Sequence, residues 1–287
     1  MPTENQTGLT LLPGHESFKG VRVVPGMTEA EYRPLPAMNA SALRCLSTLT
    51  PAHWSHQLAN PERTTAMAMG SALHAAVLEP VDFFNRYAVA PECDRRTTAG
   101  KATWADFLAR NAGREPLKQE DFEVVEGMRD GLIRHADCKM WLDLCASREV
   151  VLVGELDGLQ AKAKIDAVTM SQGYYLDVKS MSGPATLDNC RRESEQRGYF
   201  LAMTFYRRML RAAGVEVNGA ALLFVEKERP WCARALPIDP LTLDAMELEV
   251  DAAIVRYRRW LVNPAEGWVS DEVELSLSPW KRKALVQ

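Results

Sequence analysis

Three carboxylates and a lysine are the residues with the clearest potential for chemistry: Glu149, Asp166, Asp177 and Lys179. Carboxylate oxygens bind hard cations such as Mg²⁺, and a nearby ammonium group stabilises charge or assists an attacking water. Two acids and one lysine at one end of a sheet are therefore what a Mg²⁺-dependent phosphodiesterase needs. On its own, an Asp-x-Lys tripeptide is common, and on an exposed strand it is usually a solvated ion pair.

The elements that must position these residues are three adjacent β-rich runs. They cover residues 150–156, 159–168 and 174–178. Asp157-Gly158 is a strong hairpin signal between the first two runs. In the third run, strand alternation places Asp177 and Lys179 on one face and Val178 on the other. Because the third run is apolar enough to be at least half buried, its acid requires a charged partner or a metal.

An apolar, alanine-rich helix begins upstream at Thr65 and is stopped by Pro80. Gly70 is small enough for close backbone approach, and His74 lies one turn later on the same side. A lone histidine in an apolar helix is more often a hydrogen-bonded core residue than a metal ligand. From the residues alone, this structural interpretation of His74 is favoured.

The rest of the chain predicts helices before and after the central sheet. Helices are expected at 39–60, 101–111, 118–135, 137–146, 188–213 and 240–262, and further strands at 219–226 and 232–238. The polar segment 92–101 predicts a loop that orders around DNA. Trp104, Phe107 and Leu108 are expected to face inward. The last helix has an apolar stripe formed by Leu241, Leu243, Met246, Val250, Ile254, Tyr257 and Leu261.

Composition indicates a globular protein with one large domain, or at most two. The 287 residues are 47% hydrophobic and 25% charged. Six cysteines without a CxxC pair support neither a zinc knuckle nor an iron–sulfur cluster, and we interpret them as reduced thiols. Neither a membrane span nor a signal-peptide core is visible, so a cytoplasmic location is expected. The net charge of −4 excludes a broadly basic DNA coat, although basic residues can still cluster locally.

Together these segments resemble RecE-type (exonuclease VIII) phage or prophage nucleases of the PD-(D/E)xK superfamily, akin to the RecB nuclease domain and lambda exonuclease. The resemblance runs from Met38 to the Trp280 region. Its blocks are Met38–Leu43, Thr50–His53, Met69–His74 with Leu78–Pro80, Thr98–Lys101 before Trp104, Gly158 through Lys162–Asp166, and Leu176–Ser180. The chain departs from the family at Ile165, where a proline is common, and at Ala202, where the family has a glutamine four residues before a tyrosine.

The resemblance implies an α/β fold, with a PD-(D/E)xK restriction-endonuclease-like core of a central mixed sheet flanked by helices. Residues 1–37 would be a flexible arm and lead-in, and 38–287 a single exonuclease domain. It also implies site residues. Lys179, Glu149, Asp166 and Asp177 would be catalytic, and the metal ligands would be His74, Asp166, Asp177 and the carbonyl of Val178. DNA contacts would come from Arg95, Arg96, Lys101, Arg192, Gln196, Tyr199 and Tyr206, with Gln196 and Tyr199 candidates to replace the missing glutamine. Less specific basic candidates are Arg191, Arg197, Arg207, Arg208 and Arg211.

The activity that the resemblance implies is Mg²⁺-dependent 5′→3′ digestion of double-stranded DNA ends. Mn²⁺ should also support it, because imidazole nitrogen is a softer ligand than oxygen. The product would be a 3′ single-stranded overhang for a RecT-like annealing partner in recombination, and the enzyme would be a homo-oligomer, in relatives a ring. The alternatives are a site-specific or structure-specific endonuclease with the same core, and a non-catalytic DNA-binding descendant.

Overall fold

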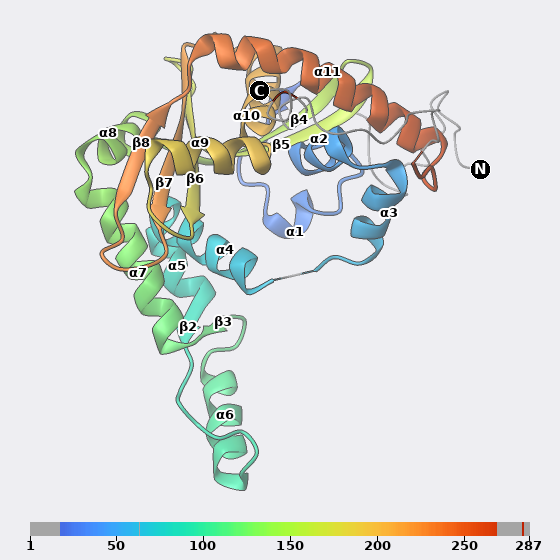
Figure 1. The fold of residues 1–287 in the computed structure, drawn as a ribbon. Helices are drawn as coiled ribbons and strands as arrows, with labels where there is room; N and C mark the ends of the chain where they lie inside the picture. The colour runs from blue at the N-terminus through green and yellow to red at the C-terminus, as the bar shows by residue number, and fades with distance from the viewer. Residues whose placement is uncertain (1–17, 63, 269–282, 284–287) are drawn as a thin grey trace.

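A six-stranded sheet forms the centre of the molecule, and helices cover both of its faces (Figure 1). The computed structural model describes residues 18–62, 64–268 and 283. The strand order is β1-β4-β5-β6-β7-β8, and within it only β6 and β7 are parallel. The strands are β1 (Arg22–Val23), β4 (Ser147–Leu156), β5 (Leu159–Thr169), β6 (Tyr174–Met181), β7 (Gly219–Glu226) and β8 (Ala233–Pro237). The predicted mixed α/β class is therefore confirmed.

Two hydrophobic clusters separate the helices into two layers. The larger cluster buries side chains of α2 (Ala40–Thr48), α3 (Pro51–Ala59), α9 (Leu187–Gln196), α10 (Tyr199–Ala212) and α11 (Pro240–Val262) on one face of the sheet. The smaller cluster buries side chains of α4 (Thr65–Leu78), α5 (Pro80–Arg86), α7 (Gln119–Arg134) and α8 (Ala136–Leu144). None of the helices that the structure describes is long and apolar enough to cross a membrane.

Two predicted long helices are each broken in the structure. The expected helix at 39–60 divides into α2 and α3, because Pro51 starts α3 and holds Thr50 in an extended conformation. The expected helix at 188–213 divides into α9 and α10 at Gly198, whose φ of 63° is in the left-handed region. The sheet strands and the last helix follow the prediction closely, although Leu241 is 74% exposed and does not belong to the apolar stripe.

A projecting arm extends from the body below α4 (Figure 1). Its base is a pair of parallel strands, β2 (Tyr87–Val89) and β3 (Glu115–Leu117), and its end is α6 (Thr98–Arg110). The helix begins inside the segment predicted as a loop, because Thr97 caps it by accepting a hydrogen bond from Gly100 N–H. Leu108 is 44% exposed, so the prediction that it faces inward was wrong.

The segment that leads into the core packs against the outer strands of the sheet. Residues 1–17 of the predicted arm lie outside the described residues. Further along, β1 pairs with β4, and α1 (Glu29–Tyr32) follows it. Lys162, on β5, is 5% exposed, and its Nζ atom donates hydrogen bonds of 2.9 Å to three carbonyls that follow or end α1: Tyr32, Arg33 and Leu35. Lys162 therefore ties the lead-in segment to the sheet.

Candidate active site

In the hairpin of β4 and β5, side chains alternate between the two faces of the sheet, and this alternation is interrupted at one pair of opposing acids. Pairing of Arg148 with Ala167, and of Val150 with Ile165, places Glu149 opposite Asp166. In a regular strand, residues two apart share a face, yet Ile165 packs in the larger cluster and Ala167 in the smaller one. Glu149 has a φ of 49°, which is unusual for a residue with a side chain. The break directs two carboxylates to the same place.

The neighbouring strand separates from the hairpin at the same point. Pairing between β5 and β6 ends at Ala167 and Leu176, one step before Asp166 and Asp177 would face each other. In place of a strand–strand hydrogen bond, the Asp166 carboxylate accepts one from the N–H of Val178 at 2.7 Å. As predicted, Val178 is buried on one face, while Lys179 and Asp177 form an ion pair.

His74 joins this group from α4, which begins with Thr64 accepting a hydrogen bond from Met67 N–H. The Nε2 atom of His74 lies 2.9 Å from the Val178 carbonyl oxygen, and its Nδ1 atom lies 3.3 Å from Asp166 Oδ1. Both ring nitrogens therefore face acceptors, which is the arrangement of a doubly protonated imidazole. Burial lowers the pKa of His74, but the Asp166 carboxylate raises it more, to about 9.

Three side chains can offer ligand atoms to one metal ion. A nitrogen of His74 and one oxygen each of Glu149 and Asp166 all lie within 4.8 Å of one another. Two carboxylates and an imidazole suit Mg²⁺ or Mn²⁺. In the described part of the chain, Asp177 is not in this group of three, and its carboxylate binds Lys179 instead. The donor set fits a divalent cation, and the role of each residue stays a prediction.

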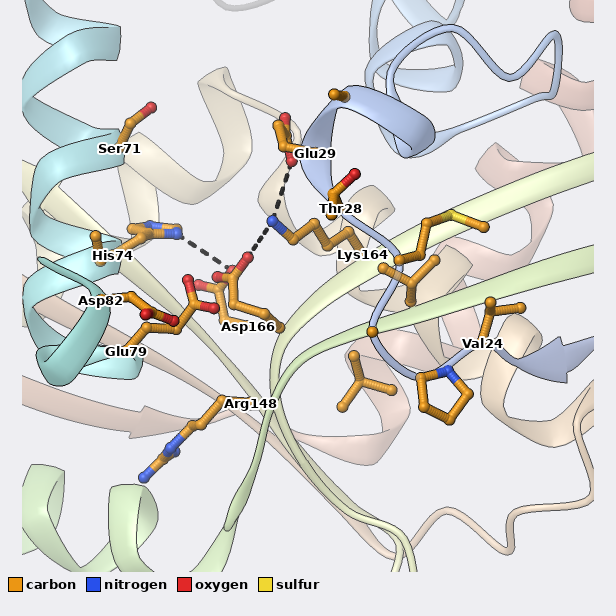
Figure 2. Close-up of a pocket in the computed structure, with 18 of the residues that line it drawn as sticks. Val24, Thr28, Glu29, Ser71, His74, Glu79, Asp82, Arg148, Lys164 and Asp166 are labelled. Atoms are coloured by element: carbon orange, nitrogen blue, oxygen red, sulfur yellow. Dashed lines mark hydrogen bonds and ion pairs between the residues drawn. The ribbon is translucent and has the colours of Figure 1, made fainter. Parts of the chain in front are cut away.

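Lys164 is a part of the site that the sequence did not indicate. Its Nζ atom binds the Glu149 carboxylate, and it lies 3.0 Å from Glu29 Oε2 on α1. Burial and the nearby Asp166 carboxylate raise the pKa of Glu149, against the lowering effect of Lys164. In Figure 2, His74 reaches toward Asp166, and Lys164 lies on the other side of the acids, where it contacts Glu29. Glu29 lies far away in the sequence, so no local pattern could have predicted its contact.

A cavity of about 1090 Å³ opens onto the three candidate ligands (Figure 2). Its further lining includes Glu79 and Asp82, at the junction of α4 and α5, and Arg86, whose guanidinium lies 2.6 Å from the Glu79 carboxylate. The carboxylates of Glu149 and Asp166, both in the group of three ligands, give the site its preference for a cation. The volume is at the upper end of the range for small-ligand pockets.

The predicted DNA-binding residues fall into three places. Tyr199 and Tyr206, on α10, lie near the acids. Lys179 Nζ is 5.0 Å from the ring centroid of Tyr199, and burial, followed by the Asp177 carboxylate, raises the pKa of Tyr206. Arg192 and Gln196 are exposed on α9. The structure does not bring the remaining three to the site, since they belong to the projecting arm: Arg95, Arg96 and Lys101.

Arg207 was among the less specific basic candidates, and this prediction was wrong. It is 3% exposed, and its guanidinium binds the carboxylates of Asp244 and Glu247 on α11. It joins two helices and has no free surface for DNA.

Metal binding at the three ligands should release a proton from His74. A metal ion needs a neutral imidazole, whereas His74 is protonated below a pKa of about 9 in the metal-free protein. At pH values below this pKa, we expect the Mn²⁺ affinity to increase about tenfold for each unit by which the pH is raised, because one proton is displaced for each ion bound. Calorimetric titration at pH 7 and pH 8, in two buffers of different ionisation enthalpy, measures both the affinity and the released proton.

His74→Gln is the matched variant for this measurement, because its side chain keeps a polar end but no titrating group. It should bind Mn²⁺ more weakly and with a much smaller dependence on pH. If the wild-type affinity is the same at both pH values, His74 is not a ligand.

Comparisons with known proteins bear on the family and the fold of the chain. The model of the family described as "PDDEXK-like domain of unknown function (DUF3799)" matches residues 41–275. No curated protein matches the chain. A solved structure from Eubacterium rectale, described as a "putative exonuclease", is 15% identical, with a TM-score of 0.60 over 90% of this chain and 98% of that chain. A "phage related exonuclease" from Haemophilus somnus 129PT is 14% identical, with a TM-score of 0.37 over 79% of this chain and 95% of that chain.

Proposed function

Because this chain belongs to the family of PDDEXK-like domains of unknown function, we propose that it is a metal-dependent deoxyribonuclease. The observation that carries the proposal is the meeting of His74, Glu149 and Asp166 beside the Asp177–Lys179 ion pair, at the point where the strands separate. The family description names a PDDEXK-like domain, and the order of Asp166, Asp177 and Lys179 matches the acids and lysine of that motif. The Eubacterium rectale protein with the same fold is itself described as a "putative exonuclease".

The finer proposal is a 5′→3′ exonuclease that acts on double-stranded DNA ends and leaves 3′ overhangs for recombination by strand annealing. It rests on the resemblance of the sequence blocks to RecE-type nucleases. On the same basis we propose a RecT-like annealing protein as partner and a homo-oligomer, with a ring as its form. The arm, with Arg95, Arg96 and Lys101, would then contact DNA away from the site of cleavage.

The residues of the site have distinct roles in this proposal. His74, Glu149 and Asp166 would hold a Mg²⁺ or Mn²⁺ ion, with Asp177 and the Val178 carbonyl as further candidate ligands. When bound, the ion would stabilise charge on the phosphate and lower the pKa of a water. Lys179 would place its ammonium beside the reacting phosphate, and the Tyr199 ring next to it limits where that ammonium can lie. Lys164 would hold the Glu149 carboxylate in position.

The proposed activity predicts that linear duplex DNA is degraded with Mg²⁺ or Mn²⁺ and is intact in excess EDTA, because the buried acids need a cation to bind phosphate. Two duplexes, one labelled at the 5′ ends and one at the 3′ ends, test the polarity. The 5′ label should be released first, as a mononucleotide. Closed circular duplex should be spared, because entry requires an end. Rapid nicking of supercoiled plasmid would favour an endonuclease, and digestion in EDTA would contradict the metal-dependent chemistry.

A further inference from the structure

Arg44, on α2, is a half-buried cation without an anionic partner in the part of the chain that the structure describes. Its Nε atom is buried and has no hydrogen-bond partner. Its two terminal nitrogens are not among the buried unpartnered atoms, and no described residue accepts a hydrogen bond from them. The end of the guanidinium is therefore open to solvent, while its stem is covered by protein.

Other shielded arginines of this chain have acceptors for their terminal nitrogens. Arg207, whose Nε atom is also buried without a partner, binds two carboxylates with these nitrogens, and Arg148 donates to two backbone carbonyls. A partly desolvated guanidinium without such partners costs free energy, so it is uncommon unless an absent ligand completes it. Arg44 therefore has the features of a ligand-binding residue more than those of a structural one.

The position of Arg44 connects it to the proposed reaction centre. Its Cζ atom lies 5.6 Å from the ring centroid of Tyr199, and Lys179 Nζ lies 5.0 Å from the same centroid. Two cations thus share one aromatic ring. Lys179 forms an ion pair with the Asp177 carboxylate, whereas no described carboxylate neutralises the charge of Arg44. The charge of Arg44 is therefore no more than one tyrosine ring away from Lys179.

The break between α9 and α10 makes room for this side chain. Gly198 is in the left-handed region, with a φ of 63°, and a Cβ atom at this position would lie 3.2 Å from Arg44 Cγ. A larger residue would press on the stem of Arg44 and would also strain the backbone. The same glycine that divides the predicted long helix thus leaves room for the Arg44 side chain beside Tyr199.

We propose that Arg44 binds a phosphate of the DNA strand next to the phosphate that is cut. A guanidinium binds phosphate through two parallel N–H donors, and its two terminal nitrogens are the ones that reach solvent here. The inference rests on the proposed function, because it takes the substrate to be DNA. It adds a residue that the sequence blocks did not single out, and it assigns that residue to positioning the strand rather than to the chemical step.

The test is the binding of a short blunt duplex to Arg44→Gln, measured by fluorescence anisotropy between 50 and 300 mM KCl, concentrations on the order of physiological salt. Both Arg44→Gln and its parent carry Asp177→Ala, so that the DNA is not cut during the measurement. We expect binding about tenfold weaker, and a slope of log affinity against log salt that falls by about one, as for one lost phosphate contact. Arg44→Lys should keep most of that slope.

Arg134→Gln is the matched control, since it removes the same charge from the exposed end of α7, a helix of the smaller cluster on the other face of the sheet. It should leave the slope unchanged. The same binding measurement is then made with duplexes that carry or lack a 5′-terminal phosphate. If the effect of Arg44→Gln is seen only with the phosphorylated duplex, Arg44 binds the end phosphate and not an internal one.

The outcomes separate this inference from the proposed function. If the parent binds DNA and Arg44→Gln binds with the same affinity and slope, the assignment of Arg44 is wrong while the nuclease proposal stands. An equal loss in Arg44→Gln and Arg134→Gln would mean a general charge effect, and it would also overturn the assignment. No DNA binding by the parent at any salt concentration would contradict both.

Discussion

Replacement of Lys179 by alanine should reduce DNA cleavage by about a thousandfold, equivalent to about 4 kcal/mol of transition-state stabilisation. The ammonium lies at the edge of the site and pairs with Asp177, so it is placed to stabilise charge on the phosphate. Because it cannot be a metal ligand, Mn²⁺ affinity should change little. Single-turnover cleavage rates beside calorimetric Mn²⁺ titrations measure the two effects separately.

The titrations should be made at pH 8 or above. Burial and the Asp166 carboxylate already raise the pKa of Asp177, and Lys179 opposes that rise. Loss of the lysine would raise this pKa further, and at low pH a protonated Asp177 could imitate a loss of metal affinity. Asp177→Ala is the comparison: it should lose cleavage and also bind metal more weakly. Equal loss of metal affinity in both variants would contradict the separate roles.

Asp166→Asn should abolish metal-dependent cleavage and weaken Mn²⁺ binding by more than about 100-fold, beyond the usual effect of residues that only support a ligand. Asp166 contributes to the group of three ligands, and its carboxylate also holds Val178 N–H and His74. Asparagine keeps one oxygen that can accept the hydrogen bond from Val178, so the fold should survive. Thermal melts with and without Mn²⁺ check this, because only the wild type should gain stability from the ion.

Asp82→Asn serves as the control for Asp166→Asn. Asp82 lines the same cavity and carries the same charge, but it is outside the group of three ligands. It should retain cleavage within a few-fold of wild type, since long-range charge effects in an open cavity are screened. If both variants lose activity equally, the cavity acts through its total charge and not through the three ligands.

Much of the fold was predictable, because local patterns determine it. The hairpin turn at 157–158, the alternation around Val178 and the last helix all depend on neighbours in the sequence, and the structure contains each of them. The two broken helices were also local in cause. Pro51 and Gly198 are both visible in the sequence, and each interrupts its helix through its own backbone conformation.

The parts of the site that were not predicted depend on distant contacts. Nothing near Lys164 in the sequence indicates Glu29, which is 135 positions away. The same holds for the break in side-chain alternation at Glu149 and Asp166. It appears only when the strand packs in the sheet, where Ile165 joins the larger cluster and Ala167 the smaller one. His74 is the intermediate case. Its helix was evident, but its contacts with Asp166 and Val178 needed the folded chain.

The anchoring of the lead-in segment by Lys162 determines where the protein can be shortened for expression. A chain trimmed to begin at Met38 would match the predicted domain boundary, yet it would remove the three carbonyls that hold the Lys162 ammonium. It would also remove β1 and leave the outer edge of β4 without a neighbour. An uncovered strand edge invites pairing with other chains. Such a shortened protein would aggregate for reasons unrelated to its chemistry, whereas one that begins before Phe18 would keep both the edge strand and the lysine's partners.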